Sequence, residues 1–579
     1  MRITQIQLNG FRNFKNAIIN VSPKTLVIGA NDVGKSNMLY AIRMLLDRGL
    51  SDWDIEPKDS DFYCHEPTTE ITITIKLEDI TEDCVLSKLD GKISDEGTLY
   101  LQYRATKGSK EYKILAGPAH SHLTELEGGR YYRKVLHVKY ISSNRDLHGY
   151  IKKEKRNLLK EAQEKRTDQE VSDDEIKLKS IEGHLTGANA AITELSYVSK
   201  ATQVINTELQ ELSFHHTGQE VIFDVGNSDI HSFVENLHLS SKVNSSNLSI
   251  GGDGRNNQIF LALWAARNEI QEENPLEVTF YCIEEPEAHL HPHQQRKLAS
   301  YLINTLKGQT FITSHSPQIA SEFSPNSIVR LSITEKQTTA ASNGCSQIIA
   351  DRFYEFGYRL NIIAAEALFS NAVFLVEGPS EVLFFKVLAR EIGIDLDKLN
   401  ISILMADGIG FETFVKILHA LNIKWVMRTD NDIMKIPKKD EFRFAGVQRA
   451  IKAYKNLPAD SGIEALISTN FAALSGFSPA LPPAFNTEIA SNFITKLKTK
   501  NIFLSKIDLE QDLLESEISQ SILEFLDVTD KQEALTIMQK RKATSMYRFL
   551  SSKSDSLKQL KNTEFAEPLY ACKSLIENA

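Results

Sequence analysis

The chain has 579 residues, of which 42% are hydrophobic and 25% charged, and a formal net charge of −10. That length predicts two or three domains rather than one core, and the acidic balance argues against a protein that coats nucleic acid by bulk charge. Five scattered cysteines without a CxxC pair argue against a zinc site or a disulfide framework. Without a signal-peptide pattern or an apolar run of about 18 residues, we expect a cytoplasmic protein with no membrane segment.

Alternating and apolar segments predict a series of strands. Ile6 and Leu8 alternate with polar neighbours in a short strand, although Ile3 is out of phase. An apolar strand over Lys24–Ile28 leads into a glycine turn and then a helical pattern over Lys35–Leu46. Further strand patterns lie at Ile71–Leu77, Leu99–Tyr103, Lys134–Tyr140, Val278–Ile283 and Thr310–Thr313. Strands that alternate with helices indicate an α/β fold.

Two other segments differ from this pattern. Residues 150–213 are rich in Lys, Glu, Leu and Ala, and the stretches KKEKRNLLKEAQEKR and IKLKSIEGHL are typical of helices with solvated faces. This segment is either a spacer or a dimerisation arm. The polar stretch at 334–344 predicts a loop, and a second α/β pattern begins at Val373 and continues to about residue 550.

Residues 29–36, GANDVGKS, match the phosphate-binding pattern GxxxxGK[ST] between a strand and a helix. The glycines let backbone N–H groups surround phosphates, and the start of the helix favours negative charge. Lys35 would reach the β- and γ-phosphates, and Ser36 would bind Mg²⁺.

Residues 280–287, FYCIEEPE, form an apolar strand that ends in paired carboxylates, as in a Walker B motif. Glu284 would hold Mg²⁺ through water, and Glu285 would polarise the attacking water. His315 follows another strand and is either a structural histidine or a sensor of the γ-phosphate. Its position after the phosphate-binding loop and the Walker B motif favours the sensor.

This order of motifs resembles the ABC ATPases of the structural-maintenance and RecF type, and the opening NGFRNF (residues 9–14) is similar to the start of that group. A signature motif would precede Walker B, and LSIGGDGR (248–255) is the candidate. It departs from LSGGQ, and Glu284 stands where aspartate is usual, so binding of ATP is expected and rapid hydrolysis is in doubt. The expected nucleotide and Mg²⁺ contacts are Arg12, Asn31, Gly34, Lys35, Ser36, Asn37, Glu284, Glu285 and His315.

In the second α/β segment, carboxylates follow successive apolar strands. Glu377 follows Val373–Val376, Asp407 follows Ile401–Met405, and Asp430 and Asp432 follow Trp425–Met427. In open α/β sheets this edge is where ligands bind. A glutamate on one strand and Asp-x-Asp on another match the Toprim pattern, and oxygen ligands suit Mg²⁺ or Mn²⁺. Two such ions would activate water and stabilise the leaving oxygen of a phosphodiester.

Further residues extend this candidate site. Glu381 lies one helical turn after Glu377, and Asp508 and Glu510 follow the apolar segment Ile502–Leu504. Lys542 would neutralise charge at the scissile phosphate, with Lys540 as the alternative. The predicted metal ligands are Glu377, Glu381, Asp430, Asp432, Asp508 and Glu510, and the predicted catalytic residues are Glu377, Asp430, Asp432, Asp508 and Lys542.

Nine Lys or Arg residues lie between Lys424 and Lys455, against four acids. Beside a metal site, such a basic stretch indicates a groove for a DNA backbone; the alternative is a soluble, flexible loop. The nine are residues 424, 428, 435, 438, 439, 443, 449, 452 and 455.

An ABC ATPase followed by Toprim is the arrangement of the OLD (overcoming lysogenization defect) nucleases. The stretches FRNF, GANDVGKSN, GGDGR, IEEPE, SHSP, FLVEGPSE, RTDND and LSKIDLEQDL carry the resemblance across nearly the whole chain. The chain most resembles the nuclease subunits of Gabija anti-phage systems, in which GGDGR and IEEPE look normal. The resemblance implies an α/β fold with four segments: ATPase at 1–149 and 236–345, a helical dimerisation insertion at 150–235, and Toprim at 346–579.

The resemblance also implies cutting of double-stranded DNA at the Toprim site, control by nucleotide, assembly into a dimer or tetramer, and a UvrD-like helicase partner. Two other functions stay open on the residues alone. One is a RecF-like, ATP-dependent DNA-binding or clamp protein, which would not need the acid cluster. The other is topoisomerase or primase work, which would need a nucleophilic tyrosine such as Tyr547 on an additional domain, or a template-binding module.

Overall fold

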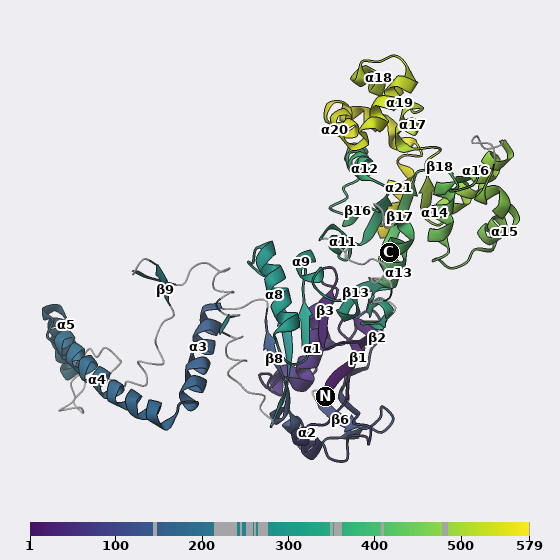
Figure 1. Cartoon of the computed structure of the whole chain (residues 1–579). Coiled ribbons are helices and arrows are strands. Elements are labelled where there is room, and N and C mark those ends of the chain that lie inside the picture. The colour runs from purple at the N-terminus through teal and green to yellow at the C-terminus, as the bar shows by residue number, and fades with distance from the viewer. Residues whose placement is uncertain are drawn as a thin grey trace. The chain divides into compact units, whose positions relative to one another are not determined.

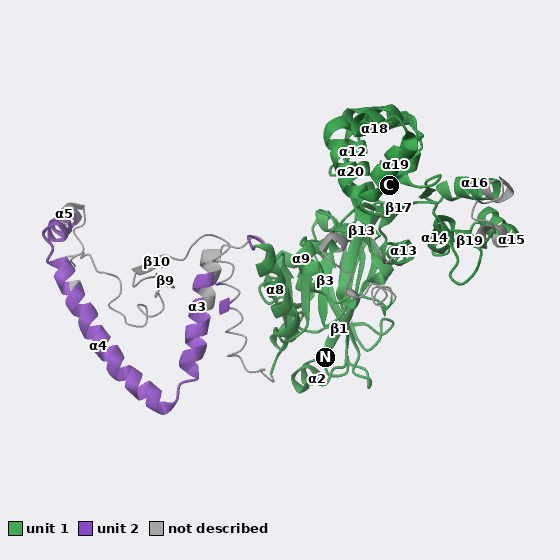
Figure 2. Ribbon diagram, turned by 45° about the horizontal axis from the view of Figure 1, so that its top comes forward, with its two compact units in different colours: residues 1–143, 275–287, 291–579 green, residues 144–274, 288–290 purple. Residues whose placement is uncertain are grey.

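The computed structural model describes residues 1–109, 111–142, 147–212, 240–243, 246–249, 259, 262–263, 276–347, 351, 362–406, 410–477 and 484–577. The chain divides into two compact units, one of residues 1–143, 275–287 and 291–579 and the other of residues 144–274 and 288–290 (Figure 2). Within the described ranges, none of the helices has both the length and the apolar character needed to cross a bilayer.

An antiparallel sheet opens the first unit, in the order β2-β1-β4-β5-β6-β7; its strands β1, β2 and β6 are labelled in Figure 1. Strand β1 (Arg2–Phe11) is longer than the alternation of Ile6 and Leu8 predicts. Its register with β4 shifts between Ile3 and Gln5, and this irregularity allows Ile3 to be buried although it is out of phase. The other elements of this part are β2 (Phe14–Asn20), β4 (Glu70–Glu78), α2 (Asp83–Lys88), β5 (Leu99–Thr106), β6 (Tyr112–Gly117) and β7 (Thr124–Glu125).

A second sheet has the order β14-β13-β3-β12-β11-β8 and is parallel except for β14. Helix α1 (Lys35–Leu46) packs against strands of both sheets, so one hydrophobic core extends across them. The strands predicted from the sequence in this sheet are confirmed to within two residues. Its elements are β3 (Lys24–Ile28), β8 (Leu136–Ile141), β11 (Val278–Glu284), α8 (Pro292–Asn304), β12 (Thr310–Thr313), α9 (Pro317–Ala320), β13 (Ile328–Thr334) and β14 (Gln337–Ala340).

The loop predicted at 334–344 is wrong, because most of this stretch belongs to a β-hairpin. Strand β14 pairs antiparallel with β13, and Glu335 and Lys336 turn the chain with φ angles of 50° and 66°. Thr338 is fully buried in β14, and its hydroxyl donates a hydrogen bond to the carbonyl of Val33 in the phosphate-binding loop. A tertiary contact therefore holds a polar segment in a strand, where composition alone indicates a loop.

A parallel sheet in the order β16-β15-β17-β20 forms the core of the C-terminal part. Its strands confirm the apolar segments predicted there, and β15 (Ala372–Val376) is buried throughout. The carboxyl ends of β15, β17 and β20 meet at one edge of this sheet. The other strands are β16 (Ile401–Met405), β17 (Lys424–Thr429), β20 (Ile502–Leu504) and the hairpin β18 (Ile433–Lys435) with β19 (Phe442–Phe444).

Helices surround this C-terminal sheet, and α21 packs on β15 and β17. A second hydrophobic core joins α12 with α20 and the segment that follows α20. The helices are α11 (Ile362–Ala367), α12 (Pro379–Glu391), α13 (Phe411–Ala420), α14 (Ala445–Tyr454), α15 (Ser461–Ser475), α16 (Ala484–Lys498), α17 (Leu509–Leu514), α18 (Ser519–Leu526), α19 (Lys531–Lys540), α20 (Lys542–Lys553) and α21 (Glu567–Glu577).

The second unit is helical over residues 147–212, as the sequence predicts. Its helices are α3 (Leu147–Glu164), α4 (Asp168–Thr193) and α5 (Ser196–Leu212), followed by the short strands β9 (Ser240–Val243) and β10 (Ser246–Ser249). The Thr167 hydroxyl accepts the backbone N–H of Glu170, whose carboxylate accepts the N–H of Thr167, and this capping box begins α4. The predicted end of the insertion at residue 235 lies outside the described residues.

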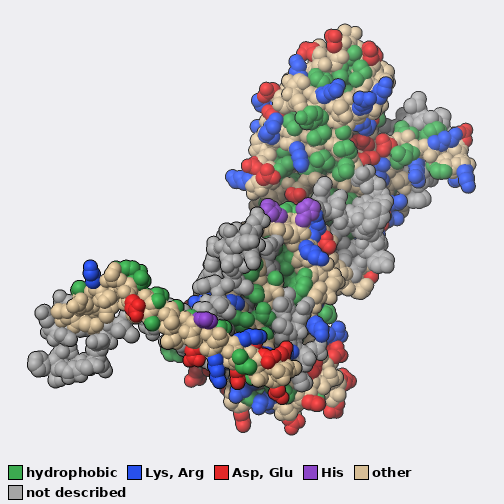
Figure 3. Space-filling view, turned by 60° about the vertical axis from the view of Figure 1, so that its left-hand side comes forward, with side chains coloured by type: hydrophobic (Ala, Val, Ile, Leu, Met, Phe, Trp, Pro, Cys, Tyr) green, Lys and Arg blue, Asp and Glu red, His purple; other side chains and the backbone are tan. Residues whose placement is uncertain are grey.

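Surface charge is mixed on the face that Figure 3 shows, where Lys and Arg side chains are interspersed with Asp and Glu.

Candidate functional site

The phosphate-binding loop follows β3 and ends at the start of α1. Lys35 is 6% exposed, and its ammonium group donates to the carbonyls of Gly29 at 3.0 Å and Ala30 at 2.8 Å. Burial lowers the pKa of Lys35 to about 8. Gly34 has a φ of 101°, and a Cβ there would lie 2.1 Å from the side-chain nitrogen of Asn13, so the loop requires glycine.

A chain of polar side chains joins this loop to the opening NGFRNF motif. Arg12 donates to Asn37 at 2.8 Å, and Asn37 donates to Asn13 at 2.7 Å. Asn13 in turn donates to the carbonyl of Val33 at 2.8 Å and to the Thr338 hydroxyl at 2.5 Å. The network gives the predicted Arg12 and Asn37 a place beside the loop. Asn13 is not among the site residues predicted from the sequence, although it lies in the same NGFRNF motif as Arg12.

The carboxylates at the end of β11 lie two strands away from β3, which leads into the phosphate-binding loop, because β12 pairs with both strands. Glu284 is 7% exposed and accepts a hydrogen bond from the Tyr140 hydroxyl at 2.7 Å. Glu285 lies 3.3 Å from the His315 ring, and burial together with the charge of Lys35 lowers the pKa of His315. The structure thus brings together Lys35, Glu285 and His315 as the motifs predict.

Glu287 takes a structural position that the predicted set leaves out. Its carboxylate accepts the Ser314 hydroxyl at 2.7 Å and the backbone N–H of His315 at 2.8 Å, which fixes the turn that carries His315. Asn31 and Ser36 are exposed at the loop and at the first turn of α1. The signature candidate is outside the described residues from 250 to 255.

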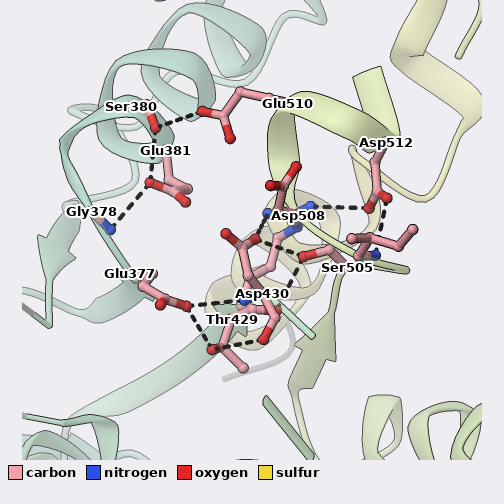
Figure 4. A network of polar contacts seen from close by, with 12 residues as sticks. Glu377, Gly378, Ser380, Glu381, Thr429, Asp430, Ser505, Asp508, Glu510 and Asp512 are labelled. Carbon is pink, nitrogen blue, oxygen red and sulfur yellow. Dashed lines mark hydrogen bonds and ion pairs between the residues drawn. The ribbon is translucent and has the colours of Figure 1, made fainter. Parts of the chain in front are cut away.

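Glu377, directly after β15, lies in a hydrogen-bond network at the sheet edge (Figure 4). Its carboxylate accepts the Thr429 hydroxyl at 2.9 Å and the backbone N–H of Asp430 at 3.1 Å. Arg449 of α14 donates to Glu377 at 3.1 Å and to Asp432 at 2.9 Å. One guanidinium therefore holds together the acids from two strands, and sequence reasoning assigned Arg449 only to the basic stretch.

Asp430 is 4% exposed and lies deeper than Asp432. It accepts a hydrogen bond from the Ser505 hydroxyl at 2.7 Å and lies 3.8 Å from Arg428. Burial, with the charges of Glu381 and Glu377 in addition, raises the pKa of Asp430 to about 7, although Arg428 and Ser505 oppose the shift. This carboxylate is therefore short of compensating positive charge.

A second group of acids faces the first from α12 and α17. Glu381 accepts the backbone N–H of Gly378 at 3.1 Å, and the Ser380 hydroxyl donates to Glu510 at 3.2 Å. Burial raises the pKa of Glu510. Asp508 begins α17 by accepting the N–H of Gln511 at 2.8 Å.

Lys542 is the cation of this second group. Its ammonium group lies 2.9 Å from Glu510 and 3.9 Å from Asp508. Burial lowers the pKa of Lys542, but the contacts with these two acids outweigh burial and raise it above its ordinary value. Lys540 is exposed at the end of α19, so the geometry favours Lys542 over the alternative.

Asp512, which lies in the LSKIDLEQDL stretch but is not among the predicted metal ligands, supports the turn after β20. It accepts the backbone N–H groups of Lys506 at 2.9 Å and Ile507 at 3.2 Å, and lies 3.8 Å from Arg428. Asp407, which follows β16, lies outside the described residues.

Negative charge exceeds positive charge at this edge, which we call the acid cluster. Three cations, Arg428, Arg449 and Lys542, lie among its carboxylates. Seven carboxylates against three cations leave an excess of four negative charges, which fits hard divalent cations with oxygen ligands. In the side-chain positions of the described residues, however, no three acids, histidines or cysteines are grouped to hold one ion. The seven are Glu377, Glu381, Asp430, Asp432, Asp508, Glu510 and Asp512.

The fold separates the cations of the basic stretch (residues 424–455) into some that contact the acid cluster and others that lie on an exposed hairpin. Arg428 and Arg449 point into the acid cluster rather than toward solvent. On the exposed hairpin, Lys435 pairs with Asp440 at 3.0 Å and Lys439 with Glu441 at 3.7 Å. The prediction of nine cations along one groove therefore overstates the charge available to a DNA backbone.

Comparison with known proteins gives similarity along the whole chain. A family model described as AAA ATPase domain matches residues 1–127 and 103–320, and one described as overcoming lysogenization defect protein-like, TOPRIM domain, matches residues 368–432. The chain is 24% identical to Endonuclease GajA of Bacillus cereus (strain VD045), over 96% of each protein. It is also 24% identical to Old nuclease of Escherichia phage P2, over 75% of this chain and 78% of that protein.

A solved structure of an Smc head bound to the C-terminal winged-helix domain of ScpA is 16% identical, with a TM-score of 0.37, over 59% of this chain and 97% of that one. The ATPase model alone matches more than half of the residues, and the Toprim match contains Glu377, Glu381, Asp430 and Asp432. The chain belongs to the AAA ATPase domain family and carries after that domain a Toprim domain of the OLD type.

Proposed function

We propose that the chain is a divalent-metal-dependent DNA endonuclease that cuts phosphodiester bonds at the acid cluster. The observation that carries this proposal is the convergence of carboxylates from the ends of β15, β17 and β20 with an excess of negative charge. The two curated relatives bear the names endonuclease and nuclease, which supports the same reaction.

The donor set suits two Mg²⁺ or Mn²⁺ ions, held by Glu377, Asp430 and Asp432 with Glu381, Asp508 and Glu510 on the facing side. When bound, such ions supply an activated water and stabilise the leaving oxygen of the phosphodiester. Arg449 forms ion pairs with Glu377 and Asp432, and Lys542 forms one with Glu510. Because these carboxylate oxygens are already paired, the side chains of the acids or of the two cations would have to rotate for the acids to bind metal.

Two cations of the chain have further roles in this proposal. Lys542, at the open side of the cluster with 43% of its side chain exposed, would neutralise charge that develops at the scissile phosphate. Arg449 would fix the positions of the Glu377 and Asp432 carboxylates relative to each other, since it donates to both and to the backbone carbonyl of Asp430 at 2.8 Å.

The ATPase domain would bind ATP with Mg²⁺ and regulate cutting. Lys35 and the loop N–H groups would bind the phosphates, Ser36 and Glu284 would hold the ion, and Glu285 with His315, which lie 3.3 Å apart, would act at the γ-phosphate. Glu284 is engaged by Tyr140, and the LSIGGDGR stretch departs from the ABC signature, which favours binding over fast hydrolysis.

The cellular role that we propose is anti-phage defence of the Gabija type. It is supported by the similarity to Endonuclease GajA over 96% of both chains. With it we propose assembly into a dimer or tetramer and a UvrD-like helicase as partner, acting on double-stranded DNA in the cytoplasm.

Plasmid cleavage tests the proposed reaction. Purified full-length protein is incubated with supercoiled plasmid and Mg²⁺ or Mn²⁺, with and without ATP, beside the Glu377→Ala variant. Nicked or linear product that requires the metal and Glu377 is expected. Cleavage that persists in Glu377→Ala, or in excess EDTA, would overturn the proposal, and a wild-type chain that binds DNA without cutting under any of these conditions would favour the clamp function.

A further inference from the structure

Arg330 lies on β13, next to the strand that leads into the phosphate-binding loop. Strand β13 pairs parallel with β3 and sets Arg330 opposite Ile28. The next residue, Leu331, approaches the loop so closely that a Cβ on Gly29 would lie 2.6 Å from its carbonyl oxygen. With Thr338 on β14 bonded to Val33, the β13–β14 hairpin contacts both ends of the loop.

The Arg330 side chain leaves the ATPase sheet and enters the Toprim domain. It is 6% exposed and donates to four backbone carbonyls, those of Leu368 and Ser370 at 3.0 Å and of Leu421 and Asn422 at 3.1 Å. Among the described residues, no carboxylate pairs with it. Two of these carbonyls end helix α13 and the others follow α11, where helix dipoles favour a cation.

The four carbonyls lie in the segments that lead into two strands, β15 and β17, whose other ends reach the acid cluster. Ser370 lies two residues before β15, which ends beside Glu377, and Asn422 lies two residues before β17, which ends beside Asp430. Two further hydrogen bonds join the same domains: Asn422 donates to the Ser332 hydroxyl at 3.3 Å, and Ser342 donates to the carbonyl of Ala420 at 2.7 Å.

We infer that Arg330 is the positioning residue that couples nucleotide binding at the phosphate-binding loop to the acid cluster. A buried guanidinium with four carbonyl partners cannot move away from them without leaving a desolvated charge. The starts of β15 and β17 therefore follow β13 when the loop closes on phosphates. The inference rests on the proposed function, because it assigns the residue through which nucleotide would regulate cutting.

Backbone hydrogen exchange of the full chain tests this coupling without relying on DNA cleavage. Exchange of peptides that cover residues 371–377 and 423–430 is followed with and without Mg²⁺ and the non-hydrolysable ATP analogue AMP-PNP. In the wild type we expect the analogue to change exchange in both peptides by about fivefold or more, which is the lower end of ordinary coupling between sites.

The Arg330→Met and Arg330→Lys variants should lose that response while they retain affinity for the analogue. The control is Arg130→Met, which removes another buried arginine inside the ATPase domain, one that donates to the carbonyls of Met44 and Leu50 and pairs with Asp52 at 2.8 Å. This control should keep the response. Arg330→Lys preserves the charge, so it is the informative variant if Arg330→Met does not fold.

Two results would overturn the inference: no response of the Toprim peptides in a wild type that binds the analogue, or a full response in Arg330→Lys or Arg330→Met. Failure of the proposed function would look different, since the wild type would then fail to cut DNA with any divalent metal whatever the exchange pattern.

Discussion

The phosphate-binding loop and the acid cluster bury groups of opposite charge, an ammonium group in one and carboxylates in the other. At the loop, one ammonium group is buried among carbonyl oxygens, and burial lowers the pKa of Lys35 to about 8. At the acid cluster, carboxylates outnumber cations, and burial raises the pKa of Asp430 to about 7. Each site therefore holds charge that the chain itself compensates only in part, and a ligand of the opposite charge would stabilise it.

The comparison teaches which ligand each site favours. Phosphate oxygens would restore the full charge of Lys35, whereas divalent cations would restore the ionised form of Asp430. It also separates their chemistry: when one site is empty, a substitution there should leave the affinity of the other site for its own ligand unchanged.

Substitution of Glu377 by Gln should have the largest effect. It removes one charge from the cluster and a metal ligand in the proposed reaction, so we expect DNA cleavage to fall by about a thousandfold or more in a single-turnover assay. Affinity for ATP should not change. Glu464→Gln, on the exposed start of α15, is the matched control and should cut at the wild-type rate.

Substitution of Lys35 by Ala tests the other site. Loss of a charge-assisted contact with phosphate should weaken ATP binding by about 100-fold, as measured by calorimetry. Lys24→Met is a matched control, because Lys24, on β3, also donates to backbone carbonyls, those of Leu306 and Gly308, and burial lowers its pKa to about 8. It should reduce stability without weakening nucleotide binding; equal loss in both variants would contradict a phosphate role for Lys35.

Substitution of Gly446 by Ala should disturb the acid cluster without removing an acid. A Cβ there would lie 2.0 Å from the carbonyl oxygen of Asp430, so α14 must shift and carry Arg449 with it. We expect a loss of about 1–3 kcal/mol in stability and weaker Mn²⁺ binding, with ATP affinity retained. Gly183→Ala, in an open part of α4, should leave Mn²⁺ binding unchanged and raise stability by up to about 1 kcal/mol, because alanine favours a helix interior over glycine.

The pH dependence of binding should run in opposite directions at the two sites. Below pH about 7, Mn²⁺ must displace a proton from Asp430, so its affinity should fall by up to about tenfold per pH unit as the pH decreases. Above pH about 8, phosphate must recruit a proton to Lys35, so ATP affinity should fall as the pH increases. Parallel pH profiles at the two sites would contradict the contrast in charge.

The sequence predicts the elements that carry local signals. The strand and helix around GANDVGKS, and the strands β12, β16 and β20, have the bounds that their apolar patterns indicate. Each of these patterns lies within a single short segment.

The features that the sequence does not predict depend on distant residues. Asn13 contacts Thr338, which is 325 residues away, and Arg449 contacts Glu377, which is 72 residues away. In a basic stretch, nothing local distinguishes an arginine that faces acids from a lysine that faces solvent. The site residues predicted as metal ligands lie together, but their roles stay predictions.

The most direct test of the central claim measures Mn²⁺ binding and DNA cleavage in the same samples. Full-length wild type, Glu377→Gln and Lys35→Ala are titrated with Mn²⁺ by electron paramagnetic resonance without nucleotide, and each is then given a labelled duplex. We predict that Glu377→Gln loses both Mn²⁺ binding and cleavage, while Lys35→Ala keeps the Mn²⁺ binding of the wild type. Cleavage by Glu377→Gln at the wild-type rate, with or without loss of Mn²⁺, would contradict the assignment of the acid cluster as the nuclease site.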